Sequence, residues 1–161
     1  MSDQELRQAV LDASRRADVL AAVGQVYTDL QAAIAARRPA CQRSGRCCRF
    51  DEYGHRLYVT TMELAAFVAQ LHGPGQDRDG RGCPFQVGPL CGAHAIRPLG
   101  CRAFYCDASA VPWQADVYEQ FHARLKKLHQ AMGVAYFYVE WRRALGAVLS
   151  AKGPGLLNRT L

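Results

Sequence analysis

The distribution of cysteines constrains this chain more than any other feature of its sequence. All seven cysteines fall within residues 41–106, and the rest of the 161 residues contain none. They stand in polar segments that are rich in arginine, glycine and proline, whereas core cysteines usually sit among apolar residues. The pattern therefore predicts that at least four of them are thiolate ligands of one or two metal centres.

Disulfide bonds explain the cysteines less well. A chain of this length buries a core without cross-links, and an odd number of cysteines cannot pair completely. The amino terminus carries charges from Asp3 onward and reads as an amphipathic helix, not as a secretory signal. No run approaches the roughly 18–20 apolar residues of a membrane span. We expect a cytoplasmic protein with reduced thiols and no membrane partner.

The apolar periodicity predicts a mainly α fold. Helical spacing runs through residues 4–36, as one helix or as two with a break near Ser14–Asp18. A capping box at Thr60 and Glu63 predicts a helix over 61–72, after a short strand at 57–59. Pro112 begins a further helix, and Tyr138, Trp141, Leu145 and Val148 suggest a last helix that ends near Gly153.

These elements predict a single domain, 1–161. An N-terminal helical segment (1–40) and C-terminal helices (107–161) enclose an irregular, cysteine-rich metal-binding middle (41–106) with at most a short β element. The segment 73–82 is a polar, glycine-dense loop, and residues 83–106 should be irregular with one helical turn. A bound metal is one way to fix such a stretch of backbone.

The candidate metal ligands are all the cysteines: Cys41, Cys47, Cys48, Cys83, Cys91, Cys101 and Cys106. None of them forms a C-x-x-C pair, so the spacings of zinc fingers and ferredoxins do not apply. The side chains of adjacent Cys47 and Cys48 are expected to diverge. One would face a metal, and the other a second metal or the core.

Three blocks of this sequence resemble the YkgJ-like cysteine-cluster family, which is described as a zinc- or iron-chelating domain. The first is CQRSGRCCR at 41–49, where the family usually reads C-x-x-C-G-x-C-C-R. The second is the helix start at Thr60 and Glu63, followed by CPF at 83–85. The third is CGAHAIRPLGCRAFYC at 91–106, similar to C-x-[IV]-Y-x-x-R-P-x-x-C-R-x-[FY]-x-C. The resemblance implies metal chelation without fixing the ion.

Two positions depart from the family pattern. Ser44 stands where the family has its second cysteine, and His94 stands where it usually has tyrosine. Eight cysteines would complete two four-ligand centres, but seven do not. His94 lies at C-x-x-H spacing from Cys91 and is a less certain eighth ligand; the alternative is that it replaces a packing tyrosine.

The cofactor is expected to be an iron–sulfur cluster or zinc. Five arginines lie close to the cysteines in sequence and slightly favour a cluster, because positive charge near the sulfurs tunes its potential: Arg43, Arg46, Arg49, Arg97 and Arg102. Arg97 and Arg102 either bind an anionic substrate or, as the preferred interpretation, bond carboxylates or loop carbonyls. His122 and His129 are expected on a solvated helix face.

The sequence thus predicts a metal-binding protein with a structural, redox or metal-handling role. One alternative is a metal-dependent enzyme with an open coordination position, for example in protein modification. The other is a zinc-stabilised nucleic-acid-binding module. The formal charge of +6 counts every cysteine as neutral, and bound thiolates would offset it, so nucleic acid is an unlikely partner. A protein partner remains open, and no catalytic residue is assigned.

Overall fold

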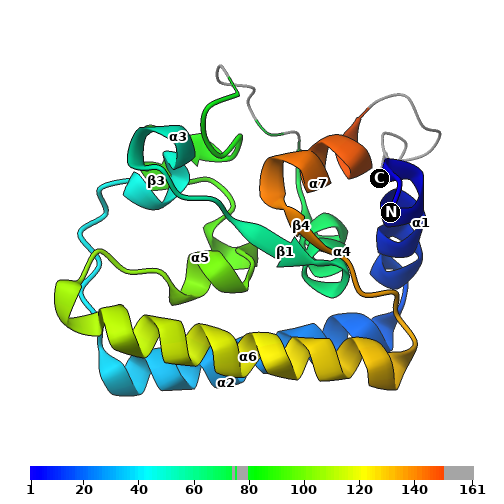
Figure 1. The fold of residues 1–161 in the computed structure, drawn as a ribbon, viewed down its shortest axis with the longest axis horizontal. Coiled ribbons are helices and arrows are strands. Elements are labelled where there is room, and N and C mark those ends of the chain that lie inside the picture. Colours follow the sequence, from blue (N-terminus) through cyan, green and yellow to red (C-terminus); the bar gives the residue numbers. More distant parts are fainter. Residues whose placement is uncertain (74, 76–79, 151–161) are drawn as a thin grey trace.

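The structure, a computed structural model, describes residues 1–73, 75 and 80–150. It is mainly helical, as predicted (Figure 1). The helices are α1 (Asp3–Ser14), α2 (Ala17–Arg37), α3 (Phe50–Tyr53), α4 (Thr61–Gln70), α5 (Leu99–Ala103), α6 (Val111–Met132) and α7 (Trp141–Leu149). Three 3-10 turns are η1 (Arg46–Cys48), η2 (His94–Ile96) and η3 (Ala108–Ala110), and the strands are β1 (Tyr58–Thr60), β2 (Gln86–Val87), β3 (Leu90–Cys91) and β4 (Tyr138–Glu140).

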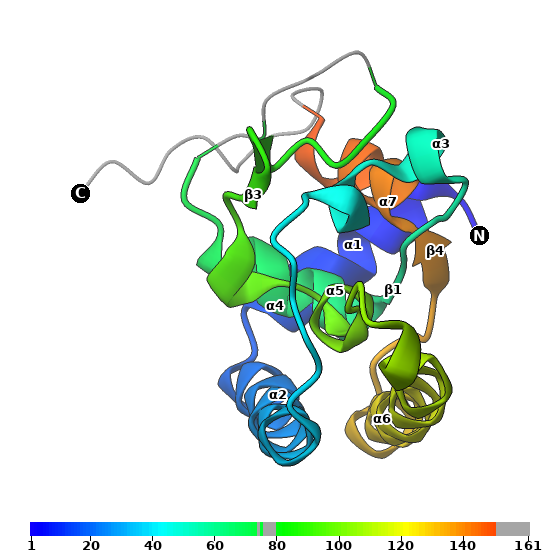
Figure 2. The ribbon, with the colours of Figure 1, turned by 90° about the vertical axis from the view of Figure 1, so that its left-hand side faces the viewer.

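The two long helices, α2 and α6, lie side by side along one side of the molecule (Figures 1 and 2). Helix α4 packs against α1 and α2, and α1 also packs against α7. The short elements η1, α3 and the β2–β3 hairpin lie on the opposite side from α2 and α6, and α5 lies in between (Figure 2). The cysteine-rich region thus covers a helical core built from both ends of the chain.

The N-terminal helical segment is two helices. A capping box of Ser2 and Glu5 starts α1, and Arg15 and Arg16 form the break before α2. By length and composition α2 is apolar enough to cross a membrane, with a mean hydropathy of 1.3. Its apolar face, however, is buried in this fold, through Val19, Val23, Val26, Leu30 and Ile34. These residues account for part of the apolar character of α2, since 28% of its apolar window is buried.

The predicted strand near 57–59 exists, and its partner was missed. β1 pairs antiparallel with β4, with Val59 opposite Val139. Tyr138, which the sequence placed in the last helix, lies in β4 opposite Thr60. Tyr138 lies at helical spacing from Trp141, but its backbone is extended because it pairs with β1, a segment distant in sequence. The predicted end of α7 near Gly153 lies outside the described residues, as do positions 74 and 76–79 of the predicted loop.

Each of the first three backbone N–H groups of α4 donates a hydrogen bond. Thr60 and Glu63 form the predicted capping box. The N–H of Thr61 donates to the Phe137 carbonyl at 3.1 Å, and that of Met62 donates to Nε2 of His129 at 3.1 Å. His129 is 1% exposed, so the expectation of a solvated face is wrong for this residue. His129 is buried because its ring accepts the Met62 N–H, a donor at the helix start that would otherwise lack a partner.

Candidate metal centre

Five of the predicted ligands come together from four separate segments. Cys47 and Cys48 lie in η1, Cys83 precedes β2, Cys91 ends β3 and Cys101 lies in α5. Cys48 and Cys83 are buried, and the other three are half-buried. Segments separated by more than thirty residues in sequence thus present thiols to one another, which local spacing could not predict.

Close backbone packing joins η1 to the segment of Cys83. The N–H of Cys83 donates to the Cys48 carbonyl at 2.8 Å. A Cβ at Gly82 would lie 2.7 Å from the same oxygen, so only glycine fits there. Gln86 donates from Nε2 to the Gly45 carbonyl at 3.1 Å and pairs with Cys91 in the β2–β3 hairpin. These bonds hold three cysteine segments in a fixed arrangement.

The Cys48 thiol is the hub of the group. The thiols of Cys47, Cys83 and Cys91 are near enough to shift its pKa. Contact with Cys48 lowers the pKa of Cys47 to about 7 and that of Cys91 to about 6, and it also lowers the pKa of Cys83. The same contacts raise the pKa of Cys48. The expectation that the side chains of Cys47 and Cys48 diverge stays a prediction.

Cys101 is the fifth thiol of this group. Burial raises its pKa well above the usual range, and the neighbouring thiols of Cys83, Cys91 and Cys47 add to the effect. Its helix begins where the Leu99 N–H donates to Oε1 of Glu63 at 2.8 Å. Glu63 is 2% exposed, and burial raises the pKa of its carboxyl. A buried acid from α4 thus fixes the helix that carries Cys101.

The two remaining cysteines belong to a second, more exposed group. Oγ of Ser44 lies 3.7 Å from Sγ of Cys106. The Ala40 N–H donates to Asp107 at 3.0 Å, which brings the segment of Cys41 to that of Cys106. Cys41 is exposed and helps to raise the pKa of Tyr105, after burial and against the effect of Arg97. Ser44, the missing cysteine of the family pattern, therefore faces a cysteine.

The arginines of the third block bond loop carbonyls. Arg97 donates from Nε to the His94 carbonyl at 2.9 Å, and Arg102 donates to the carbonyls of Arg97 and Ala95 at 2.6 and 2.7 Å. The guanidinium of Arg102 also stacks 4.2 Å from the ring of Tyr27. The preferred interpretation of carbonyl binding is confirmed for both arginines.

His94 lies at the edge of the site. It begins η2 and is exposed. Burial and the charges of Arg97, Arg102 and Arg43 lower the pKa of its imidazole. The structure shows no hydrogen bond between its ring and Cys91. Because the side chain is exposed, it also contributes little to packing.

Among the described residues, no group of three or more His, Cys, Asp or Glu side chains is placed so that it could hold a metal ion. Four sulfurs around one ion lie at equal distances of about 3.8 Å from one another. The thiols as placed do not meet that arrangement, although thiols are the donor type that thiophilic metals prefer.

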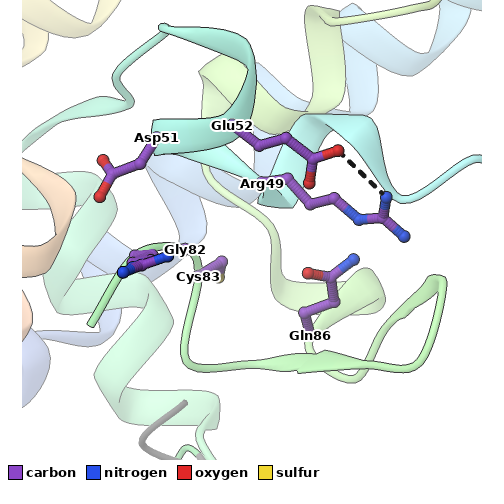
Figure 3. A pocket seen from close by; sticks show the side chains of 7 residues that line it. Arg49, Asp51, Glu52, Gly82, Cys83 and Gln86 are labelled. Carbon is purple, nitrogen blue, oxygen red and sulfur yellow. Dashed lines mark ion pairs between the residues drawn. The ribbon is translucent and has the colours of Figure 1, made fainter. Parts of the chain in front are cut away.

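A pocket opens beside the thiols. It has a volume of about 580 Å³ and is lined by Arg49, Asp51, Glu52, Arg81, Gly82, Cys83 and Gln86 (Figure 3). Arg49 and Glu52 form an ion pair of 3.6 Å across it, and Asp51 pairs with Arg142 at 3.1 Å. Cys83 is the described cysteine that lines this pocket, although its side chain is buried at 8% exposure.

Comparison with protein-family models, with curated proteins and with solved structures found no match for the chain. The resemblance to the YkgJ-like cysteine-cluster family therefore stays a prediction.

Sequence reasoning missed three side chains that shape the site. Glu63 was recognised as a helix cap but not as the anchor of α5. Trp141 was placed in the apolar stripe of the last helix, but its packing beside this site was not predicted. Gln86 carries no local signal, and its burial at 8% exposure becomes visible only in the folded chain.

Proposed function

We propose that this protein binds a metal through the thiolates of Cys47, Cys48, Cys83 and Cys91, and that a single zinc ion fits best. The observation that carries the proposal is that backbone bonding brings the segments of these four cysteines together: Cys83 bonds to Cys48, and Cys91 pairs with Gln86 in the β2–β3 hairpin. Soft thiolate ligands select zinc, copper(I) and iron–sulfur clusters. Zinc is bound by four thiolates at about 2.3 Å.

Four thiolates complete a tetrahedral zinc site, so we prefer one zinc ion to the iron–sulfur cluster favoured on sequence grounds. Cys101 is then an additional thiol beside the ion. The charge of Arg97, which lowers the pKa of both Cys47 and Cys91, would offset part of the negative charge of a zinc tetrathiolate.

The role that this arrangement supports best is structural. The ligands lie in η1, in the segment before β2 and in β3, and each of these is a short element of two or three residues or a loop. A metal would bond them to one another and hold them over the helical core. Binding free energy of this kind becomes folding free energy for the segments that it joins.

The test is metal analysis of anaerobically purified protein together with its absorption spectrum. Colourless protein with one zinc per chain supports the proposal. Brown protein with iron and sulfide would instead establish an iron–sulfur cluster. The variant Cys48→Ser should lose the metal, whereas the matched variant Cys106→Ser, in the second group, should keep it. Equal retention by both variants would contradict the assignment of ligands.

A metal-dependent enzyme is the second candidate, and the pocket beside Cys83 is the observation that favours it. An enzyme needs a coordination position that substrate can reach. Protein loaded with cobalt(II) reports such a position, because added azide then changes the visible d–d bands. Unchanged bands at saturating azide would rule out an open position and leave the structural role.

A further inference from the structure

An arginine-rich surface lies beside the candidate metal centre. The two blocks 41–49 and 91–106 contain five arginines and no aspartate or glutamate. Among the described residues only one of the five, Arg49, forms an ion pair, with Glu52. The four guanidinium groups that no described carboxylate neutralises are those of Arg43, Arg46, Arg97 and Arg102. Arg97 bonds the His94 carbonyl through Nε alone, so its two terminal nitrogens have no described partner.

Contacts between the two blocks bring the exposed arginines against the second block. The backbone N–H of Arg46 donates to Oγ of Ser44 at 3.3 Å, and this oxygen lies 3.7 Å from Sγ of Cys106. Arg43 directly precedes Ser44, and the side chains of Arg43 and Arg46 are both exposed. The positive charge of the first block is therefore presented to solvent next to the end of the second.

A bound metal would neutralise only part of this charge. The sequence alone disfavours nucleic acid, because bound thiolates offset the formal charge of +6. Four thiolates around one Zn²⁺, however, carry a net charge of only −2. Two of the proposed ligands, Cys48 and Cys83, are also buried, whereas Arg43 and Arg46 are exposed. An anionic partner therefore meets a positive surface here with or without the metal.

Two exposed aromatic rings belong to the same surface. Tyr53 is 40% exposed, and the guanidinium of Arg46 stacks 4.5 Å from the centre of its ring. Phe104 is 38% exposed and lies parallel to the ring of His55, at 5.9 Å between centroids. Nε2 of His55 donates to the Cys47 carbonyl at 3.2 Å, so Phe104, directly after α5, is joined to η1. The rings and the arginines thus alternate across η1, α3 and the end of α5.

This combination matches the chemistry of a single nucleic-acid strand. Guanidinium groups bind phosphate through two parallel hydrogen bonds, and unpaired bases stack on aromatic rings. An acidic protein segment would use the arginines but not the exposed rings, and a duplex keeps the faces of its bases covered. We propose that this surface binds single-stranded nucleic acid. Its phosphates contact Arg43, Arg46 and Arg97, and its bases stack on Tyr53 and Phe104. The inference goes beyond the proposed metal site and does not depend on the identity of the ion.

The test is fluorescence anisotropy of a fluorescein-labelled strand of about 12 deoxythymidines, titrated with the full-length protein at several salt concentrations. Oligouridine of the same length is the RNA probe, and binding of either strand supports the proposal. Three phosphate contacts predict that the logarithm of the association constant falls with that of the salt concentration, with a slope of about −2. Arg43→Gln and Arg46→Gln should each reduce the slope by about 0.7. Phe104→Ala should weaken binding about fivefold or more at every salt concentration.

Matched controls separate this surface from the net charge of the chain. Arg15→Gln removes an exposed positive charge at the end of α1, where Arg15 pairs with Asp12, and should leave affinity and slope unchanged. Tyr58→Ala removes a ring in β1 that is 37% exposed and should also leave the affinity unchanged. Arg43→Gln replaces an exposed side chain without an ion pair, so it decides the question even if Phe104→Ala does not fold.

Four results would overturn the proposal. One is that neither strand binds at low salt, and another is that Arg15→Gln weakens binding as much as Arg43→Gln does. Binding of polyglutamate in place of both strands would identify an acidic protein segment as the partner. Equal affinity for a duplex, with no effect of Phe104→Ala, would mean that the surface binds phosphates alone.

Discussion

Oε1 of Glu63 accepts the backbone N–H of Leu99 at 2.8 Å, and this bond joins the N-terminus of α4 to that of α5. The other carboxylate oxygen accepts the N–H and the hydroxyl of Thr60. One buried side chain therefore completes the cap of a core helix and sets the position of the helix that carries Cys101. The scaffold and the candidate metal centre meet at this residue.

Replacing Glu63 by alanine should destabilise the fold by about 2–4 kcal/mol, because buried donors lose a charged acceptor. The control is Glu5→Ala, which breaks the same kind of capping box at the exposed start of α1 and should cost clearly less. Urea denaturation followed by circular dichroism gives both values. Equal losses in the two variants would show that the bond to Leu99 contributes nothing.

His129 should make stability depend on pH. Its Nδ1 donates to the Leu125 carbonyl at 2.9 Å while Nε2 accepts from Met62, so the folded state holds it neutral. Burial lowers the pKa of this imidazole, with a smaller contribution from His122. The unfolded chain therefore binds more protons below about pH 6.5, and the free energy of unfolding should fall as pH decreases through and below that value.

The variant His129→Leu tests this directly. It leaves the Met62 N–H without a partner and should cost about 1–3 kcal/mol at neutral pH. It should also lose less stability than the wild type between pH 7.5 and 5, measured by urea denaturation at each pH. His72→Gln, at an exposed histidine, should retain the wild-type profile. The hypothesis fails if His129→Leu falls as steeply with acid as the wild type.

Much of the helical scaffold could be predicted from the sequence because its signals are local. The capping box of α4 uses residues three apart, and Pro112 stands in the first turn of α6. Strand β4 and the burial of His129 escaped prediction because both depend on partners about seventy residues or more away. Apolar spacing alone placed Tyr138 in a helix, and tertiary pairing overrode it.

The candidate site could likewise be predicted only in part. Sequence alone indicated which residue types bind metal, but not that Cys47 and Cys48 share one group or that Cys41 and Cys106 lie apart from it. Those divisions depend on Cys83 bonding to Cys48 and on Ala40 bonding to Asp107. Contacts between loops have no periodic signal in the chain, so they became visible only in the fold.

Gly45 should be essential for the arrangement of η1. It has φ = +72°, and a Cβ there would lie 2.6 Å from Nε2 of Gln86 and 2.9 Å from the Pro89 carbonyl. Gly45→Ala should therefore displace Cys47 and Cys48 and weaken zinc binding by tenfold or more, about 1.4 kcal/mol or greater. Competition with a chromophoric chelator measures the affinity.

Gly88→Ala is the matched control for that variant. Gly88 has φ = +59°, so alanine meets a similar backbone strain of about 1–2 kcal/mol, but a Cβ there has no atom within 4 Å. Its zinc affinity should stay close to that of the wild type. If both variants lose affinity equally, backbone strain rather than the clash with Gln86 is responsible.

Ser44→Cys should raise the metal content of the protein. The Ser44 hydroxyl already lies 3.7 Å from Sγ of Cys106, so the variant places a third thiol beside Cys106 and the nearby segment of Cys41. Three thiolates and a water molecule are sufficient to bind zinc. We expect elemental analysis to give close to two ions per chain, against one in the wild type. Ser14→Cys, at the end of α1, adds a thiol far from both groups and should leave the count unchanged. A Ser44→Cys protein that binds no more metal than the wild type would mean that Cys41, Ser44 and Cys106 do not form a second site.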